Sequence, residues 1–80
     1  MKLPRNVNGD EMVKGLRRVG YEWTRQTGDH VYMTTQQNGE HHVSVPLHNP
    51  IRVGTLSTIL SAVAAHLRLE RDELIRQMKL

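Results

Sequence analysis

The first apolar pattern along the chain has helical spacing. Apolar residues recur every three or four positions at Met12, Val13, Leu16 and Val19. The stretch before them, Asn8-Gly9-Asp10-Glu11, has the spacing of a capping box, in which an Asn side chain and a Glu side chain satisfy each other's backbone N–H groups. Gly20 stands where a left-handed C-cap belongs. We therefore predict a helix from about residue 9 to 19.

Three alternating segments follow and predict strands. Residues 21–26 are aromatic and β-branched, residues 30–35 place Val31 and Met33 on one face, and residues 42–47 alternate in the same way. Residues 27–29 (TGD) form the first turn. Asn38-Gly39 predicts a second hairpin, whose loop is longer than two residues because two glutamines precede it. Pro46 limits the third strand to an edge position or to its own end.

The last part of the chain predicts two more helices. A helix from Thr55, as cap, to Ala65 has its apolar face at Leu56, Ile59, Leu60 and Val63, and a short helix covers about 70–78. The predicted fold is α+β, in a single domain spanning residues 1–80. It has a helix, a three-stranded antiparallel sheet, a second helix and a short C-terminal helix. The two longer helices must cover the same face of the sheet, because each has one apolar stripe to bury. The opposite face, which carries His30 and Tyr32, is expected to stay open.

Composition narrows the function only slightly. The 80 residues include no cysteine, so disulfides and thiolate metal sites are excluded. The N-terminus has no apolar run of a signal peptide or membrane anchor, so no membrane association and a cytoplasmic location are expected. Lys and Arg outnumber Asp and Glu by 11 to 8, for a net charge of +3. That charge is compatible with a nucleic acid or an acidic protein partner, and it does not decide between them.

The histidines are the candidate chemistry. His30 follows the glycine turn directly, and strand alternation places it on the open face. His41 and His42 are adjacent in a strand and point to opposite faces, so they cannot chelate one ion; neither a metal nor another cofactor is expected. His48, in the loop beyond Pro46, could contact phosphate or carry a second proton, although an ordinary polar loop residue is the simpler account. His66 ends a helix, where its interaction with the helix dipole is a sufficient explanation.

A cationic face and several aromatic residues are the other candidates. Lys14, Arg17 and Arg18 lie on the polar face of the first helix, with Lys2, Arg5, Arg25 and Arg52 as extensions. A solvated face explains any one of them, but Arg25 leads into the turn before His30 and could touch a phosphate. Tyr32 shares the face of His30 and could stack on an unpaired base. Tyr21 and Trp23 are expected in the core.

Three segments in order carry a resemblance to a known family. They read MKLPRNVNGDEMVKGLRRVGYEWTRQTGDH, VSVPLH and RVGTLSTIL, and their spacing resembles that of the HicA (YcfA-like) toxins from residue 1 to about 63. The resemblance implies a fold like that of double-stranded-RNA-binding domains and a role as mRNA interferase toxin of a toxin–antitoxin system. It further implies metal-independent endoribonuclease cleavage of single-stranded mRNA, with no cofactor and with a HicB-like antitoxin as partner.

The resemblance also assigns a catalytic residue. The essential histidine of the family's Gly-Ser-His turn falls on His30, with Gly28 and Asp29 as the turn that positions it. Asp29 stands where Ser is usual. A carboxylate close to the ring would favour its protonated form and would also repel phosphate. The lysine cluster with which true double-stranded-RNA-binding domains begin their last helix is missing, so duplex binding of that kind is not implied.

The catalytic role expected of His30 is that of a general acid or base. RNA carries its own nucleophile, the 2′-OH, and cleavage therefore needs proton transfer, for which imidazole is suited at neutral pH. Two other classes stay open. One is an RNA-binding module without catalysis, if Asp29 has compromised the site. The other is a protein-interaction domain, which would use the uncharged helix at residues 55–65.

Overall fold

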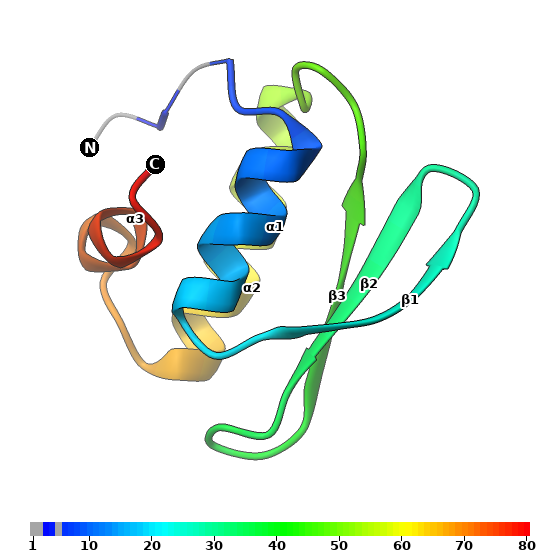
Figure 1. The fold of residues 1–80 in the computed structure, drawn as a ribbon. Helices are drawn as coiled ribbons and strands as arrows, with labels where there is room; N and C mark the ends of the chain where they lie inside the picture. The colour runs from blue at the N-terminus through cyan, green and yellow to red at the C-terminus, as the bar shows by residue number, and fades with distance from the viewer. Residues whose placement is uncertain (1–2, 5) are drawn as a thin grey trace.

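The computed structural model of the chain describes residues 3–4 and 6–80. Its elements run in the order α1 (Gly9–Arg18), β1 (Glu22–Thr27), β2 (His30–Thr35), β3 (His41–Pro46), α2 (Val53–Leu67) and α3 (Arg71–Met78), as Figure 1 shows. The predicted α+β fold is confirmed in its element order and in its three-stranded antiparallel sheet. Lys2 and Arg5, named above as extensions of the cationic face, lie outside the described residues.

Helix α1 begins with the predicted capping box. The Asn8 side chain accepts a hydrogen bond from the Glu11 N–H at 2.8 Å, and the Glu11 carboxylate accepts one from the Asn8 N–H at 2.9 Å. The helix ends at Arg18, and Gly20 follows with a φ of +103°, in the left-handed region that glycine tolerates. Local sequence alone therefore defines both ends of this helix to within a residue.

The sheet has the order β1-β2-β3, so β2 is central. Gly28 and Asp29 form a two-residue loop between the paired residues Thr27 and His30. Gly28 has a φ of +58° at the first loop position. The second loop spans residues 36–40, between the paired Thr35 and His41, which confirms the prediction of a longer loop. Strand β3 begins and ends one residue earlier than predicted, so Leu47 lies just beyond its end.

The helices form two further layers. Helices α1 and α2 lie on the same side of the sheet, and α3 packs against these two helices away from the strands (Figure 1). The buried side chains form one core, with fully buried members at Met12, Leu16, Val31, Met33, Val45, Leu60, Leu74 and Met78. The predicted placement of both longer helices on one face is thus confirmed, and no helix of residues 3–4 and 6–80 covers the other face of the sheet.

One predicted core residue lies at the surface. Tyr21 is fully buried as expected, but Trp23 is 41% exposed. All six residues of β1 are exposed, because this strand is an edge of the sheet that the helices do not cover. The expectation for Trp23 was therefore wrong, since a large aromatic side chain in an alternating strand does not reveal whether that strand is covered.

The predicted start of α2 was also wrong. The helix begins at Val53 with Arg52 as N-cap, two residues before Thr55, and no side chain caps its first amides. Ile51 and Leu56 occupy the two positions of a hydrophobic staple and are 3% and 1% exposed. Burial of these two apolar side chains therefore marks the entry into this helix, where the sequence had suggested a polar cap. The helix continues to Leu67, two residues past the predicted end.

Candidate active site

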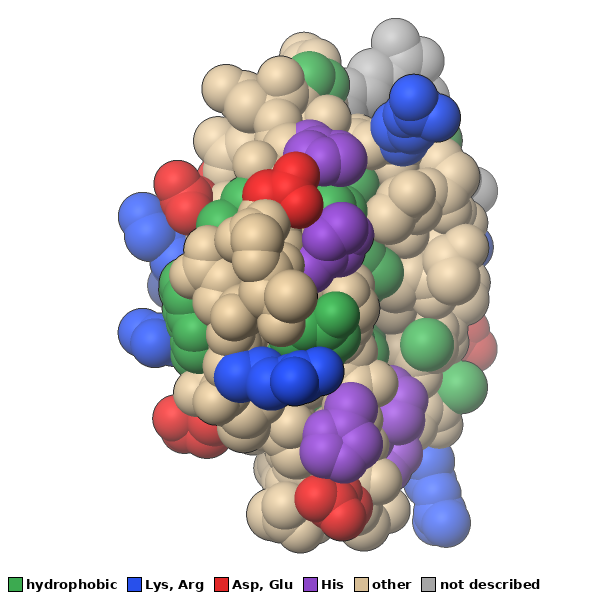
Figure 2. All heavy atoms as spheres, turned by 90° about the vertical axis from the view of Figure 1, so that its right-hand side faces the viewer, with side chains coloured by type: hydrophobic (Ala, Val, Ile, Leu, Met, Phe, Trp, Pro, Cys, Tyr) green, Lys and Arg blue, Asp and Glu red, His purple; other side chains and the backbone are tan. Residues whose placement is uncertain are grey.

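The open face of the sheet carries the candidate residues. On β2 the outward positions are His30, Tyr32 and Thr34, because the residues that alternate with them, Val31 and Met33, are fully buried under the helices. Figure 2 looks onto this face and shows histidine side chains in two groups, each beside an acidic side chain. The two groups lie toward opposite ends of the sheet. Asp29 lies beside His30 and His48, and Glu40 lies beside His42.

The backbone around His30 is held at two points. Gly28 turns the chain with its positive φ, and no atom lies within 4 Å of the place where a Cβ would stand, so conformation rather than space favours glycine there. The Asp29 carbonyl accepts a hydrogen bond of 2.7 Å from the Leu47 N–H, which ties the turn to the end of β3. The His30 side chain is 48% exposed on this support.

Asp29 lies between two histidine rings. Its Oδ1 is 3.2 Å from Nδ1 of His30, and its Oδ2 is 3.1 Å from Nε2 of His48. The ring centroids are 6.5 Å apart, with an angle of 66° between the ring planes. The hydrogen bond from His48 is the largest cause that lowers the pKa of the Asp29 carboxyl, and attraction to both rings adds to it against a smaller opposing effect of desolvation. The carboxylate is therefore ionised at neutral pH and acts as an acceptor.

His48 reaches this place through contacts of its backbone. Its carbonyl accepts a hydrogen bond of 3.0 Å from the Gly9 N–H, at the start of α1. A Cβ on Gly9 would lie 2.5 Å from the Cα of Leu47, so only glycine permits so close an approach of helix and loop. The N-terminus of α1 thus supports the loop that carries the second ring.

Sequence reasoning named His48 but did not place it beside Asp29. The two residues are 19 positions apart, and their contact follows from the register of the hairpin. His30 pairs with Pro46, so the residues just after Pro46 run past the Gly28-Asp29 turn. Aligning the apolar positions of β2 with those of β3 across the second loop is the one sequence signal that could have found this contact.

Arg25 and Tyr32 form a second row on the same face. They pair across β1 and β2, and the Arg25 guanidinium carbon lies 4.5 Å from the centre of the Tyr32 ring. The residue of β1 that pairs with His30 is Thr27, so Arg25 lies one row away from the turn. A bulge between Trp23 and Arg25 in β1 turns Arg25 to the open face, together with Thr24, whose hydroxyl contacts the Thr34 hydroxyl.

The three cations of α1 lie in the helical layer. Lys14, Arg17 and Arg18 are all exposed, on the side of the helix away from its buried residues. Arg18 Nη1 also donates a hydrogen bond of 3.0 Å to the Met78 carbonyl at the end of α3. The structure therefore groups Arg25 and Tyr32 with His30, and places the α1 cations in a different layer.

Comparison with known proteins gives the family. The family model described as the HicA toxin of bacterial toxin–antitoxin systems matches residues 9–64, well over half of the chain. The chain belongs to the HicA toxin family. The matched span includes the Gly28-Asp29 turn, His30 and His48. Neither the comparison with curated proteins nor that with solved structures found a match. Membership makes the chain a toxin whose partner is an antitoxin.

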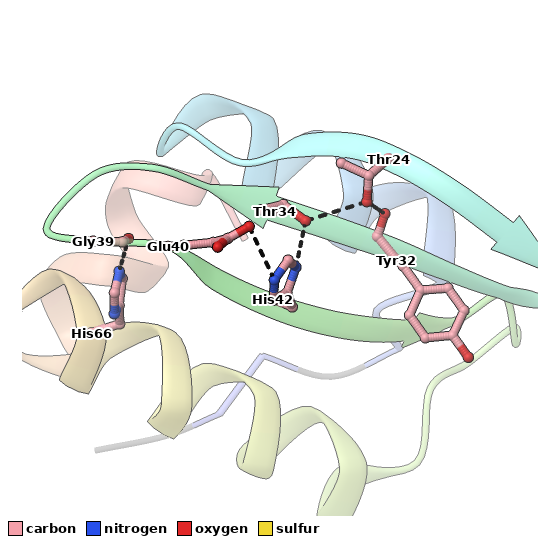
Figure 3. A network of polar contacts seen from close by, with 7 residues as sticks. All are labelled: Thr24, Tyr32, Thr34, Gly39, Glu40, His42 and His66. Carbon is pink, nitrogen blue, oxygen red and sulfur yellow. Dashed lines mark hydrogen bonds and ion pairs between the residues drawn. The ribbon is translucent and has the colours of Figure 1, made fainter.

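His42 belongs to the histidine group at the end of the sheet far from His30. Its Nδ1 lies 2.8 Å from the Thr34 hydroxyl and its Nε2 lies 3.4 Å from Glu40, as Figure 3 shows. The Thr24 hydroxyl donates a hydrogen bond of 2.9 Å to the Tyr32 carbonyl. These contacts order the open face at the end far from His30.

The other two histidines are His41 of β3, which faces the helical side of the sheet, and His66 of α2. His41 Nδ1 is 2.7 Å from the Tyr21 hydroxyl, and its ring stacks on His66 at 4.4 Å between centroids. His66 Nε2 donates to the carbonyls of Gln37 and Gly39, which fastens α2 to the second hairpin loop (Figure 3). Burial raises the pKa of Tyr21 to about 12. Burial, then the charges of His66 and His42, lower the pKa of His41.

The described residues form neither a metal-binding cluster nor a helix that could span a membrane. Over residues 3–4 and 6–80, no three His, Asp or Glu side chains converge on a point that could hold a metal ion. Within the same residues, none of the helices has the length and apolar character that crossing a bilayer requires. His41 and His42 point to opposite faces, as predicted from their adjacency.

Proposed function

We propose that this HicA-family toxin is an endoribonuclease that cleaves single-stranded mRNA without a metal ion, with His30 as a general acid or base. One observation carries the proposal. The His30 ring is half exposed on the open face of the sheet, and Asp29 holds its Nδ1. Its Nε2 forms no hydrogen bond with any residue in the described part of the chain and is free to meet a substrate.

The chemistry needs only groups of this kind. The 2′-OH of RNA attacks the adjacent phosphate once its proton is removed, which gives a 2′,3′-cyclic phosphate and a 5′-hydroxyl. A positioned imidazole contributes roughly 100- to 10,000-fold to such a step. Gly28 and Asp29 supply the rigid turn that positions the ring.

Contacts with the RNA chain are proposed for the same face. Arg25 is the cation for a phosphate next to the cleaved bond, and Tyr32 offers a ring face to an unpaired base. Lys14, Arg17 and Arg18 attract the RNA at longer range from the helical layer. A HicB-like antitoxin is proposed as the partner that silences the toxin.

Asp29 favours one alternative. An ionised carboxylate 3.2 Å from the His30 ring repels a phosphate that approaches the ring. If this repulsion prevails, the chain binds RNA without cutting it, or acts through protein contacts alone. Cleavage and binding must therefore be measured on the same samples.

The test compares the purified chain with its His30→Ala and His30→Gln variants on end-labelled single-stranded RNA, with and without EDTA. We expect cleavage by the unaltered chain in EDTA, products with 2′,3′-cyclic phosphate and 5′-hydroxyl ends, and loss of cleavage in both variants. Thermal melts should hardly change, because the ring is exposed. Full cleavage by a folded variant, or loss on chelation that Mg²⁺ restores, would overturn the proposal. Binding without cleavage by all three proteins would establish the alternative.

A further inference from the structure

Contacts within the fold account for the position of the His48 backbone, but they do not account for an imidazole side chain at this position. The carbonyl supports the start of α1, whereas the side chain is 49% exposed and its one hydrogen bond with the described residues goes to Asp29. The centroids of the His48 and His30 rings lie 6.5 Å apart, and both rings contact the same carboxylate. Because packing does not need the His48 ring, it is available for chemistry. We infer that His48 is the second proton-transfer residue of the cleavage, and that Asp29 positions both rings. This inference rests on the proposed function.

Asp29 determines which ring nitrogens can react. An ionised carboxylate only accepts hydrogen bonds, so Nε2 of His48, which hydrogen-bonds to it, carries a proton. The negative charge of Asp29, 3.2 Å from Nδ1 of His30, favours the tautomer with the proton on that nitrogen. The nitrogens left for the substrate are therefore Nε2 of His30 and Nδ1 of His48. A hydrogen bond at one nitrogen fixes the tautomer at the other, which is how carboxylates prepare imidazoles for proton transfer.

Two proton transfers need two groups. The O2′–P bond forms as O2′ loses its proton, and the P–O5′ bond breaks as O5′ gains one. The two oxygens lie roughly in line on opposite sides of phosphorus, so one ring cannot serve both at once. His30 Nε2 takes the proton of O2′, and His48 Nδ1–H gives a proton to O5′. Water then returns the two rings to their starting states.

The charges around the pair suit this division. One imidazolium and one carboxylate cancel, so a neutral His30 beside a protonated His48 leaves the site without net charge. Among the described residues, Asp29 is the charged group in contact with both rings, and Asp10 of α1 lines a hollow together with His48. Arg25 lies one row further along the sheet.

The experiment uses two RNA substrates that differ in one atom. One has an ordinary phosphodiester at the cleaved position and the other has sulfur in place of the bridging 5′-oxygen. A thiolate leaves without a proton, so the modified RNA does not need the general acid. We expect His48→Ala to lose roughly 100-fold or more on ordinary RNA and to regain near-normal rates on the sulfur substrate. His30→Ala should be impaired on both.

The pH profile gives a second readout. A general acid must be protonated, so the unaltered chain should lose activity on the alkaline side, and His48→Ala should lack this decline. His48→Gln, which keeps a polar side chain, should behave as His48→Ala does, and melts of both variants show that they fold. Asp29→Asn should lower kcat with KM unchanged or smaller, and Asp29→Glu should restore part of kcat.

The possible contrary results are distinct. Equal loss on both substrates would make His48 structural, and no loss on either would remove it from the reaction; both overturn the inference. Recovery of His30→Ala instead of His48→Ala on the sulfur substrate would reverse the roles and overturn it too. Failure of the unaltered chain to cut ordinary RNA would refute the proposed function itself, whatever the variants do.

Discussion

The Arg25 guanidinium carbon lies 4.5 Å from the centre of the Tyr32 ring, over its face. The pair combines a positive charge with a flat surface, in the row of side chains next to His30. A guanidinium held in this way keeps its charge available to phosphate and restricts the motion of the ring. The two side chains should therefore act together in RNA binding.

Substitutions separate charge from stacking in this pair. Arg25→Ala should weaken binding and reduce the slope of log affinity against log salt by about 1, because one phosphate contact is lost. Arg25→Lys should keep the slope and lose affinity, since an ammonium does not stack as a guanidinium does. Tyr32→Phe is the matched control and should bind normally. An unchanged slope in Arg25→Ala, measured by fluorescence anisotropy, would show that Arg25 does not contact phosphate.

Two glycines give opposite predictions for stability. A Cβ at Gly9 would meet the backbone of Leu47 at 2.5 Å, whereas a Cβ at Gly54 would meet nothing within 4 Å. Gly9→Ala should destabilise the fold by roughly 1–3 kcal/mol, because backbone must move. Gly54→Ala lies in a helix and should stabilise it by about 0.5–1 kcal/mol. Each kcal/mol shifts Tm by about 4–8 °C in a domain of this size.

Thermal melts of Gly9→Ala and Gly54→Ala test these two predictions of stability. Gly9→Ala should also lower RNA cleavage more than its Tm explains, because the loop that carries His48 rests on Gly9. A rise in Tm for Gly9→Ala would mean that the contact between α1 and the loop is looser than the structure indicates.

Local signals made part of the fold predictable. The capping box and Gly20 define α1, and the alternation of β2 puts His30 on the open face. These features depend on residues within a few positions of one another. The start of α2 was missed because burial of Ile51 and Leu56, rather than a side-chain cap, fixes it. Burial is a property of the assembled core.

The site was less predictable, for the same reason. His30 and its turn follow from sequence and resemblance, but the contact between Asp29 and His48 depends on strand register and on the approach of α1 at Gly9. Trp23 shows the same limit, because whether an edge strand is covered depends on helices elsewhere in the chain. Long-range geometry decided each of these features.

His41 predicts how stability depends on pH. Burial, followed by the charges of His66 and His42, lowers the pKa of His41 from its ordinary value of 6.5. The unfolded chain therefore binds a proton at this residue before the folded chain does. Stability from this group is complete above pH 6.5 and is lost as the pH falls below that value toward the lowered pKa of the folded state.

The comparison of variants isolates this contribution. His41→Gln should flatten the decline of Tm below pH 6.5, because the glutamine does not titrate. Tyr21→Phe should lower Tm at neutral pH, since it removes the hydroxyl 2.7 Å from His41 Nδ1. His30→Gln, at the other end of the open face and away from His41, is the matched control. An equally steep decline in His41→Gln and the unaltered chain would assign the acid sensitivity to other groups.

The antitoxin should cover the face that carries His30. A toxin must be silenced in the cell that makes it, and covering the ring proposed for catalysis is the most direct way. Lys14 and Arg17 are exposed on α1, and Arg25 lies near His30, so an antitoxin with acidic residues would be steered to the domain. We expect a tight complex with the cognate antitoxin in which cleavage stops.

Two measurements check this arrangement. Carbethoxylation mapped by mass spectrometry should label His30 in the free toxin and spare it in the complex. Replacing Lys14 and Arg17 by Glu should slow association more than it speeds dissociation, because exposed charges act mainly on the encounter. Arg18 is left unaltered, since it also holds the end of α3 through the Met78 carbonyl. Full labelling of His30 inside a stable, inhibited complex would mean that the antitoxin acts by a route other than covering the site.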